Sequence, residues 1–203
     1  MATIATRIGP ADHGRAMTLD EFLEAEAEEG PRYELSRGVL EVTQVPNPSH
    51  GQVVSNLYLM VARHDLAHPG VILRFGGGGE FQLLMPGMVS GRNPNLSVVI
   101  RGARKGYRGH PLPALVAEVV SARSGDRDYR LKREEYLAYG ILEYWIVDLP
   151  ARKVTVLVRD GDVWVGRSFE GDQAIVSLVL PGLAVTADDL WIGLDEYEGS
   201  EED

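Results

Sequence analysis

Residues 114–120 read Ala-Leu-Val-Ala-Glu-Val-Val, and this stretch is the strongest indication of the fold class. It is an almost continuous apolar run of the length that strands take inside a sheet covered on both faces. A helix is expected after it, over residues 126–139, with Gly140 at its end. A buried strand followed by a helix indicates an α/β domain, so the sequence predicts a mixed β-sheet flanked by α-helices.

Shorter patterns on both sides of this strand supply the other elements and add β-hairpins. The expected elements before it are a helix that begins at the capping box of Thr18 and Glu21, a hairpin over residues 33–36 and 39–45, a second helix capped by Ser49, and strands over residues 71–75, 81–85 and 96–100. The expected elements after residue 140 are strands over residues 144–147, 154–159 and 163–168, and a closing segment over residues 178–185.

The composition is typical of one compact domain, because 44% of the 203 residues are hydrophobic and 25% are charged. We expect this domain over residues 17–194, after an N-terminal arm at 1–16 and before an acidic, disordered tail at 195–203. No apolar run approaches the roughly 20 residues of a membrane span, and the first ten residues lack the apolar stretch of a secretory signal. A cytoplasmic location without membrane contact is therefore expected. The absence of cysteine excludes disulfides, thiolate metal sites and a cysteine nucleophile.

The formal net charge of −10 is unevenly distributed. Residues 30–194 contain 18 basic and 17 acidic residues, and residues 101–133 contain nine basic residues against three acidic ones. This cationic stretch can meet the phosphates of a nucleic acid, or it can be an ordinary solvated surface. The candidate phosphate contacts in it are Arg101, Arg104, Lys105, Arg108, Arg127 and Arg130.

Glu118 interrupts the buried run, where a bare carboxylate loses its hydration without compensation. Either a buried lysine or arginine pairs with it, or it faces a cleft and coordinates a hard divalent cation. Glu34 poses the same choice, because it stands between Tyr33 and Leu35 in a strand with one buried face. An exposed hairpin position is the simpler alternative for Glu34.

Lys132 belongs to a stripe on one face of the expected helix, together with Tyr129, Tyr136 and Tyr139. Its stem can run over the rings so that the ammonium reaches solvent, or the ammonium can be held in a cleft. Phosphodiester hydrolysis needs carboxylates that hold Mg²⁺ or Mn²⁺ and a positive group opposite the charge that develops on the phosphate. Glu34, Glu118 and Lys132 can supply this set.

Other chemical motifs are weaker. The four glycines at 76–79 lack the ending of a phosphate-binding loop and precede a strand, so a flexible hairpin loop is the better interpretation. His50 can ligate a metal or contact a phosphate, but a capping or packing role is the simpler reading. No G-x-S-x-G elbow occurs, which argues against a serine hydrolase.

Five stretches, in this order, make the chain recognisable: Tyr33-Glu34-Leu35, Pro94-Asn95-Leu96-Ser97-Val98-Val99, Val116-Ala117-Glu118-Val119-Val120-Ser121, residues 132–140, and Glu143-Tyr144-Trp145-Ile146-Val147-Asp148. Over residues 17–190 the chain resembles the bacterial "putative restriction endonuclease" family of the PD-(D/E)XK nuclease superfamily. The resemblance implies a restriction-endonuclease-like α/β fold, a site for Mg²⁺ or Mn²⁺, a DNA substrate and a homodimer.

The resemblance also implies roles for single residues. Glu118 matches the acidic position of the second motif, and Glu34 matches the early glutamate near the metal. Val120 stands where the motif lysine is expected, and Lys132 looks like its migrated replacement.

One position departs from the family pattern, because Pro94-Asn95 stands where the family has Pro-Asp. The amide oxygen of Asn95 is a weaker metal donor than a carboxylate. Asn95 can still ligate a weakly bound metal, Glu80 or another carboxylate can substitute, or the chain can be a catalytically silent nucleic-acid-binding or interaction module. A structural protein without a nucleic-acid partner is a third class. Our main expectation is a deoxyribonuclease in which Glu118, Asn95 and Glu34 hold the ion and Lys132 orients water or stabilises the transition state.

Overall fold

The computed structural model describes residues 6–43, 46–121 and 127–197. Its main sheet has six strands in the order β12-β11-β10-β9-β8-β5. These strands are β5 (Ile72–Gly76), β8 (Leu96–Ile100), β9 (Leu115–Val120), β10 (Glu143–Asp148), β11 (Lys153–Asp160) and β12 (Val163–Glu170). Because β9 pairs parallel with β10 and antiparallel with β8, the sheet is mixed and β9 lies inside it, as the apolar run predicts.

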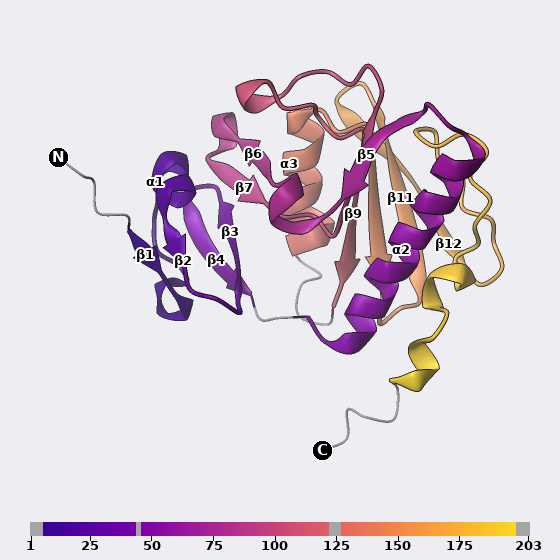
Figure 1. Cartoon of the computed structure of the whole chain (residues 1–203), viewed down its shortest axis with the longest axis horizontal. Coiled ribbons are helices and arrows are strands. Elements are labelled where there is room, and N and C mark those ends of the chain that lie inside the picture. Colours follow the sequence, from indigo (N-terminus) through magenta and orange to yellow (C-terminus); the bar gives the residue numbers. More distant parts are fainter. Residues whose placement is uncertain (1–5, 44–45, 122–126, 198–203) are drawn as a thin grey trace.

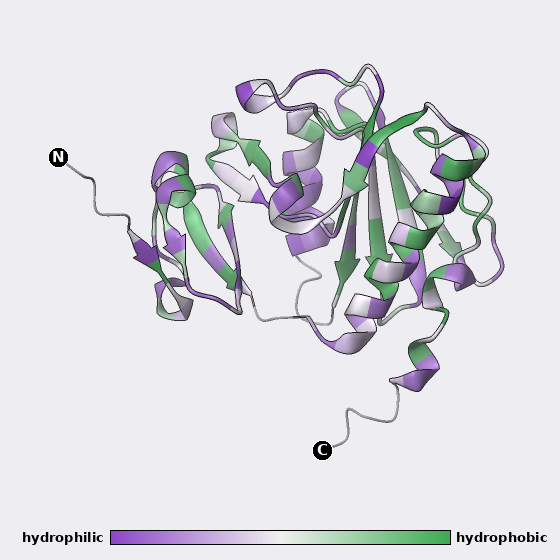
Figure 2. Ribbon diagram, in the orientation of Figure 1, coloured by the Kyte–Doolittle hydropathy of each residue, from purple (hydrophilic) through white to green (hydrophobic). Residues whose placement is uncertain are grey.

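Two helices cover opposite faces of this sheet, α2 (Pro48–Ala67) on one side and α3 (Lys132–Tyr139) on the other (Figure 1). Side chains alternate along a strand, so β9 serves both faces. Leu115, Ala117 and Val119 pack in the apolar cluster on the α2 side, and Val116 and Val120 pack in the cluster on the α3 side. Figure 2 shows that the strands of this sheet are largely hydrophobic along their length.

A second sheet of four short strands, in the order β4-β3-β7-β6, lies on the α3 side of the molecule (Figure 1). Its strands are β3 (Arg32–Ser36), β4 (Val39–Thr43), β6 (Leu83–Met85) and β7 (Ser90–Arg92). Beside it lie α1 (Leu19–Glu24) and the parallel pair of β1 (Arg7–Ile8) and β2 (Glu26–Ala27). The segment expected as an arm therefore contributes a strand, and its Ile8 is buried with Leu35 and Leu40.

Several boundaries differ from the sequence-based expectation. The first helix ends at Glu24 instead of near Gly30, because Glu26–Ala27 pair with Arg7–Ile8 and this tertiary contact overrides helix propensity. The second helix is capped by Asn47, whose side chain accepts from the His50 N–H at 3.0 Å, and not by Ser49. Residues 178–185 form no strand in the described structure.

The expected helix over 126–139 is present as a π-helical turn, Arg127–Leu131, that continues into α3 and ends at Gly140 with φ +98°. Its expected first residue, Asp126, lies outside the described residues, as do Val45 of the hairpin and most of the acidic tail. Across the described ranges, no helix has the length and hydrophobicity needed to cross a membrane.

Candidate active site

The carboxylate of Glu118 points from β9 toward α3 and meets the ammonium of Lys132. Lys132 Nζ lies 2.9 Å from Glu118 Oε1, 3.5 Å from Glu34 Oε2 and 3.4 Å from Asp128 Oδ1. The Lys132 side chain is only 4% exposed, so it does not run over the tyrosine rings to solvent. The structure thus brings together the three charged residues that the sequence nominated, and it adds Asp128.

The helix spacing explains how α3 supplies several of these groups. Asp128, Lys132 and Tyr136 follow one another at intervals of four residues, which places them on one face of the helical segment. The Tyr136 hydroxyl donates to Glu118 Oε1 at 2.6 Å, and burial raises the pKa of this tyrosine well above its ordinary value. Tyr136 therefore remains a proton donor to the carboxylate.

Glu34 comes from the smaller sheet and is held from two sides. Its Oε1 accepts from the Asn93 N–H at 2.8 Å, and its Oε2 faces Arg92 Nη1 at 3.3 Å. The exposed hairpin position that was the alternative for Glu34 is wrong, because the residue is 5% exposed. Glu34 is thereby fixed toward the main sheet, where it meets Lys132.

Arg92 is the residue that sequence reasoning missed. It is fully buried, and its guanidinium joins the smaller sheet to α3. Its contacts are Glu135 Oε2 at 2.7 Å, Ser36 Oγ at 2.7 Å, Glu41 Oε2 at 3.1 Å and Glu34 Oε2 at 3.3 Å. Arg92 ends β7, a strand of three residues without apolar alternation, so the sequence carries no pattern that would mark it.

Within the described residues, these contacts form a network of carboxylates and cations whose side chains are at most 25% exposed, and we call it the buried charge network. Its five carboxylates outnumber its three cations by two. The carboxylates are Glu34, Glu41, Glu118, Asp128 and Glu135, and the cations are Arg92, Arg127 and Lys132. The half-exposed Arg37, whose Nε lies 4.0 Å from Glu135 Oε1, offsets part of this excess, and protons or a bound cation can offset the rest.

The pKa directions show where this excess accumulates. Burial raises the pKa of Glu118, and the Lys132 charge offsets this only in part. Burial also acts on Glu34, but Lys132 and Arg92 outweigh it and hold the pKa of Glu34 below its ordinary value. Burial favours the neutral form of Lys132, yet Glu118, Glu34 and Asp128 raise its pKa, so it stays charged. Glu118 therefore takes up a proton more readily than Glu34 does, and an added cation would displace that proton.

Asn95 lies beside Glu118 at the start of β8. Its Oδ1 accepts from the Val119 N–H at 2.8 Å, and its backbone carbonyl accepts from the Tyr58 hydroxyl at 3.0 Å. Gly77 makes this placement possible, because a Cβ at that position would lie 2.2 Å from the Asn95 carbonyl oxygen. One lone pair of the Asn95 amide oxygen is thus engaged by the backbone, and a carbonyl oxygen has a second.

His50, at the start of α2, is buried against the same residues. Burial and the charge of Arg32 lower its pKa to about 4, although contacts with the Asn95 side chain and the Val119 backbone partly oppose the shift. A neutral imidazole is compatible with the packing role considered for His50, and it borders the site on the side opposite Lys132.

The donor chemistry of the site fits a hard divalent cation, because Glu34, Glu118, Asp128 and Asn95 present only oxygen ligands. Asp128 Oδ1 is buried and has no hydrogen-bond partner among the described residues, although it lies 3.4 Å from Lys132 Nζ and 3.9 Å from Arg127 Nε. The carboxylates converge on the Lys132 ammonium, however, and no three His, Cys, Asp or Glu side chains of the described ranges form a ready metal-binding group. Loading an ion would therefore require the ammonium to move aside.

The candidate DNA contacts fall into two groups. Arg127 and Arg130 lie in the π-helical turn at the Lys132 end of α3, and Arg127 Nη1 is 3.5 Å from Glu41 Oε2. The exposed loop that carries Arg101, Arg104, Lys105 and Arg108 lies at the opposite end of α3, where the Tyr107 N–H donates to the Tyr139 hydroxyl (Figure 1). These ends are about 10 Å apart along the helix. Glu80, the possible substitute for an aspartate at 95, is exposed on the 3₁₀ turn Gly78–Phe81.

Two comparisons with known proteins give matches. A family model described as Uma2, "Putative restriction endonuclease", matches residues 19–188. The crystal structure of a "putative nuclease belonging to DUF820" from Anabaena variabilis superposes with a TM-score of 0.69 at 20% sequence identity, over 88% of this chain and 99% of that chain. A search of curated proteins finds no match. The structural likeness supports the mixed α/β fold that was expected, and the family model covers most of the chain.

Proposed function

Because the chain belongs to the Uma2 family of putative restriction endonucleases, we propose that it is a divalent-metal-dependent endonuclease that hydrolyses DNA phosphodiester bonds. The observation that carries this proposal is the convergence of Glu118, Glu34 and Asp128 within 3.5 Å of one buried ammonium. Phosphodiester hydrolysis requires carboxylates that can hold a divalent cation and a positive group nearby.

In this proposal Glu118, Asp128 and Asn95 hold Mg²⁺ or Mn²⁺, with Glu34 at the edge of the site. The bound ion would supply Lewis-acid polarisation of the phosphate and activation of water.

The chain's own residues have separate tasks. The Lys132 ammonium, which lies 2.9 Å from Glu118 Oε1, would move aside when the ion binds and would then stabilise negative charge that develops on the phosphate. Tyr136 holds the Glu118 carboxylate in one orientation through its hydroxyl. Arg92 contacts no substrate in this scheme, but it positions Glu34 from one side and α3, through Glu135, from the other.

A cleavage assay tests the proposal with supercoiled and single-stranded DNA in Mg²⁺ and in Mn²⁺. Glu118→Gln and Lys132→Met are expected to lower the cleavage rate by about 100-fold or more, the effect of removing one electrostatic contact to a transition state. Glu134→Gln is the matched control, because Glu134 lies on the same helix but is half-exposed and pairs with Arg37 at 2.6 Å. Wild-type activity that survives Glu118→Gln would contradict the proposal.

A catalytically silent nucleic-acid-binding module is the second candidate, and Asn95 is the specific observation that favours it. Asn95→Asp distinguishes the two functions, because it restores the carboxylate of the family pattern without changing the side chain's size. If the wild type leaves DNA intact under all metal conditions and Asn95→Asp cleaves it, the natural chain is the silent module. Salt-dependent DNA binding by the wild type would then be its remaining activity.

A further inference from the structure

The strand β10, Glu143–Asp148, is one of the stretches that make the chain recognisable, but no residue of it has a task in the proposed site. β10 pairs parallel with β9, and Ile146 lies opposite Glu118. Side chains alternate along a strand, so Tyr144 and Asp148 lie on the same face as Ile146, which is the α3 face. These two polar side chains therefore flank the position of Glu118, and their role needs an explanation.

Both side chains bond to the π-helical turn Arg127–Leu131. The Tyr144 hydroxyl donates to the Asp128 carbonyl oxygen at 3.0 Å, and Asp148 Oδ2 accepts from the Tyr129 hydroxyl at 2.8 Å. Two successive residues of the turn are thus held, one by its backbone and the other by its side chain. The turn is attached to the sheet at the residue that supplies a carboxylate to the site.

Asp128 needs such an attachment for two reasons. It lies in the first turn of the helical segment, and first turns lack part of the intrahelical hydrogen bonds that fix later turns. Its carboxylate also shares the Lys132 ammonium with Glu118 and Glu34, and these like charges repel one another. A first turn without anchors would let Asp128 move away from the other carboxylates.

We propose that Tyr144 and Asp148 are positioning residues of the nuclease, which hold the π-helical turn so that Asp128 stays beside Glu118 and Lys132. This inference rests on the proposed function, in which Asp128 is a metal ligand. Neither residue touches the ion or the DNA in this scheme, because each acts through the turn. The helix geometry agrees with such a role, since π-helical turns are rare and are frequent at functional sites.

Mn²⁺ titration of the full chain, with the free ion measured by electron paramagnetic resonance, tests the proposal together with the cleavage assay. Tyr144→Phe and Tyr129→Phe each remove one hydroxyl and keep the ring, and Tyr129→Phe leaves the bond from the Ala151 N–H to Asp148 in place. Both variants should weaken Mn²⁺ binding by about tenfold or more, the usual effect of losing a partner that orients a metal ligand, and should slow cleavage. Unchanged Mn²⁺ affinity in either variant would overturn the proposal.

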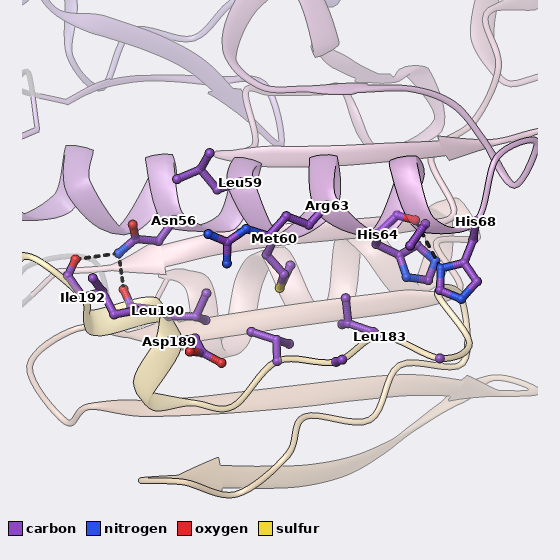
Figure 3. Close-up of a pocket in the computed structure, with 14 residues that line it drawn as sticks. Asn56, Leu59, Met60, Arg63, His64, His68, Leu183, Asp189, Leu190 and Ile192 are labelled. Atoms are coloured by element: carbon purple, nitrogen blue, oxygen red, sulfur yellow. Dashed lines mark hydrogen bonds between the residues drawn. The ribbon is translucent and has the colours of Figure 1, made fainter.

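Two control variants separate positioning from a loss of stability. Tyr139→Phe removes a hydroxyl at the other end of α3, where it accepts from the Tyr107 N–H at 3.4 Å. Asn56→Leu removes an anchor on the far side of the sheet, where the Asn56 amide donates to the carbonyl oxygens of Leu190 and Ile192 at 3.0 and 2.9 Å (Figure 3). Asn56→Leu should lower the free energy of unfolding, and both controls should keep the wild-type Mn²⁺ affinity. If Asn56→Leu weakens Mn²⁺ binding as much as the two site variants do, the proposal is wrong.

A double-mutant cycle with Asp128→Asn needs neither metal nor cleavage. Urea unfolding of the metal-free chain measures how much Asp128→Asn changes the free energy of unfolding in the wild type, in Tyr144→Phe and in Tyr129→Phe. If the two anchors hold Asp128 against Lys132, this change should be smaller in both tyrosine variants, and equal changes would contradict the positioning role. A wild type that neither binds Mn²⁺ nor cleaves DNA would contradict the nuclease proposal, and the cycle would still decide whether the anchors position Asp128.

Discussion

The two faces of β9 solve the problem of burial in opposite ways. The α2 face of β9 carries Leu115, Ala117 and Val119, which pack in an apolar cluster. These side chains need only close packing, because they have no polar group that requires a partner. On the α3 face, Glu118 lies in the buried charge network, where each carboxylate depends on a cation or a donor. One strand therefore has an apolar face that can accept other side chains of similar size and a charged face that cannot lose a partner without leaving a buried charge. The charged face is the one whose groups can take part in chemistry.

Arg92→Met should produce the largest loss of stability, because it removes a cation from the buried charge network. Removing the cation leaves Glu34 and Glu135 buried with fewer partners, and loss of one member of a buried pair costs about 3–5 kcal/mol. Arg15→Met is the matched control, because the half-exposed Arg15 pairs with Asp12 at the surface and such pairs contribute about 1 kcal/mol or less. Urea unfolding at pH 7 measures both, and equal losses would show that the network does not carry the difference.

Leu57→Ala makes the corresponding change on the apolar face. Leu57 is fully buried, and deletion of such a side chain costs about 2–5 kcal/mol through lost transfer free energy and a residual cavity. This loss involves no proton, so it should be the same at pH 6 and pH 8. A loss from Leu57→Ala that varies strongly with pH would show that the two faces are coupled.

A change at His50 should have the smallest effect on stability, and this effect should depend on pH. Its pKa is lowered to about 4 in the folded chain, so between pH 4 and 6.5 the unfolded chain binds more protons at this residue. The contribution of neutral His50 to the free energy of unfolding is therefore complete above pH 6.5. It falls as the pH decreases, by at most about 1.4 kcal/mol per pH unit. Unfolding experiments between pH 6.5 and 5 should show that stability changes less steeply with pH in His50→Gln than in the wild type, and equal slopes would contradict this prediction.

The sequence predicts the positions of Glu34, Glu118 and Lys132 better than the framework around them. An acid inside an apolar run and a lysine in an aromatic stripe are local anomalies, and the structure places all three side chains together. Asp128 could also have been found, because its spacing of four residues before Lys132 is a helical pairing signal. Whether these residues act in catalysis is a separate question that the variants above address.

Arg92 and the short strands could not be predicted, because their positions depend on partners far away in the chain. β7 is three residues long, and Arg92 meets Glu34 and Glu135, which are 58 and 43 residues away. The basic stretch illustrates the same limit. Its residues are neighbours in sequence, but α3 separates Arg104 from Arg127, so net charge over a window does not define a surface.

The Lys132 ammonium among the carboxylates has a consequence for how the protein folds. Small zinc domains fold only when they bind their ion, since no other group neutralises their ligands. Here Lys132 already serves as an internal counter-ion, so the newly made chain can reach its final shape in a cell depleted of divalent metal. If the chain has the proposed nuclease activity, a chelating agent should abolish that activity reversibly without unfolding the protein.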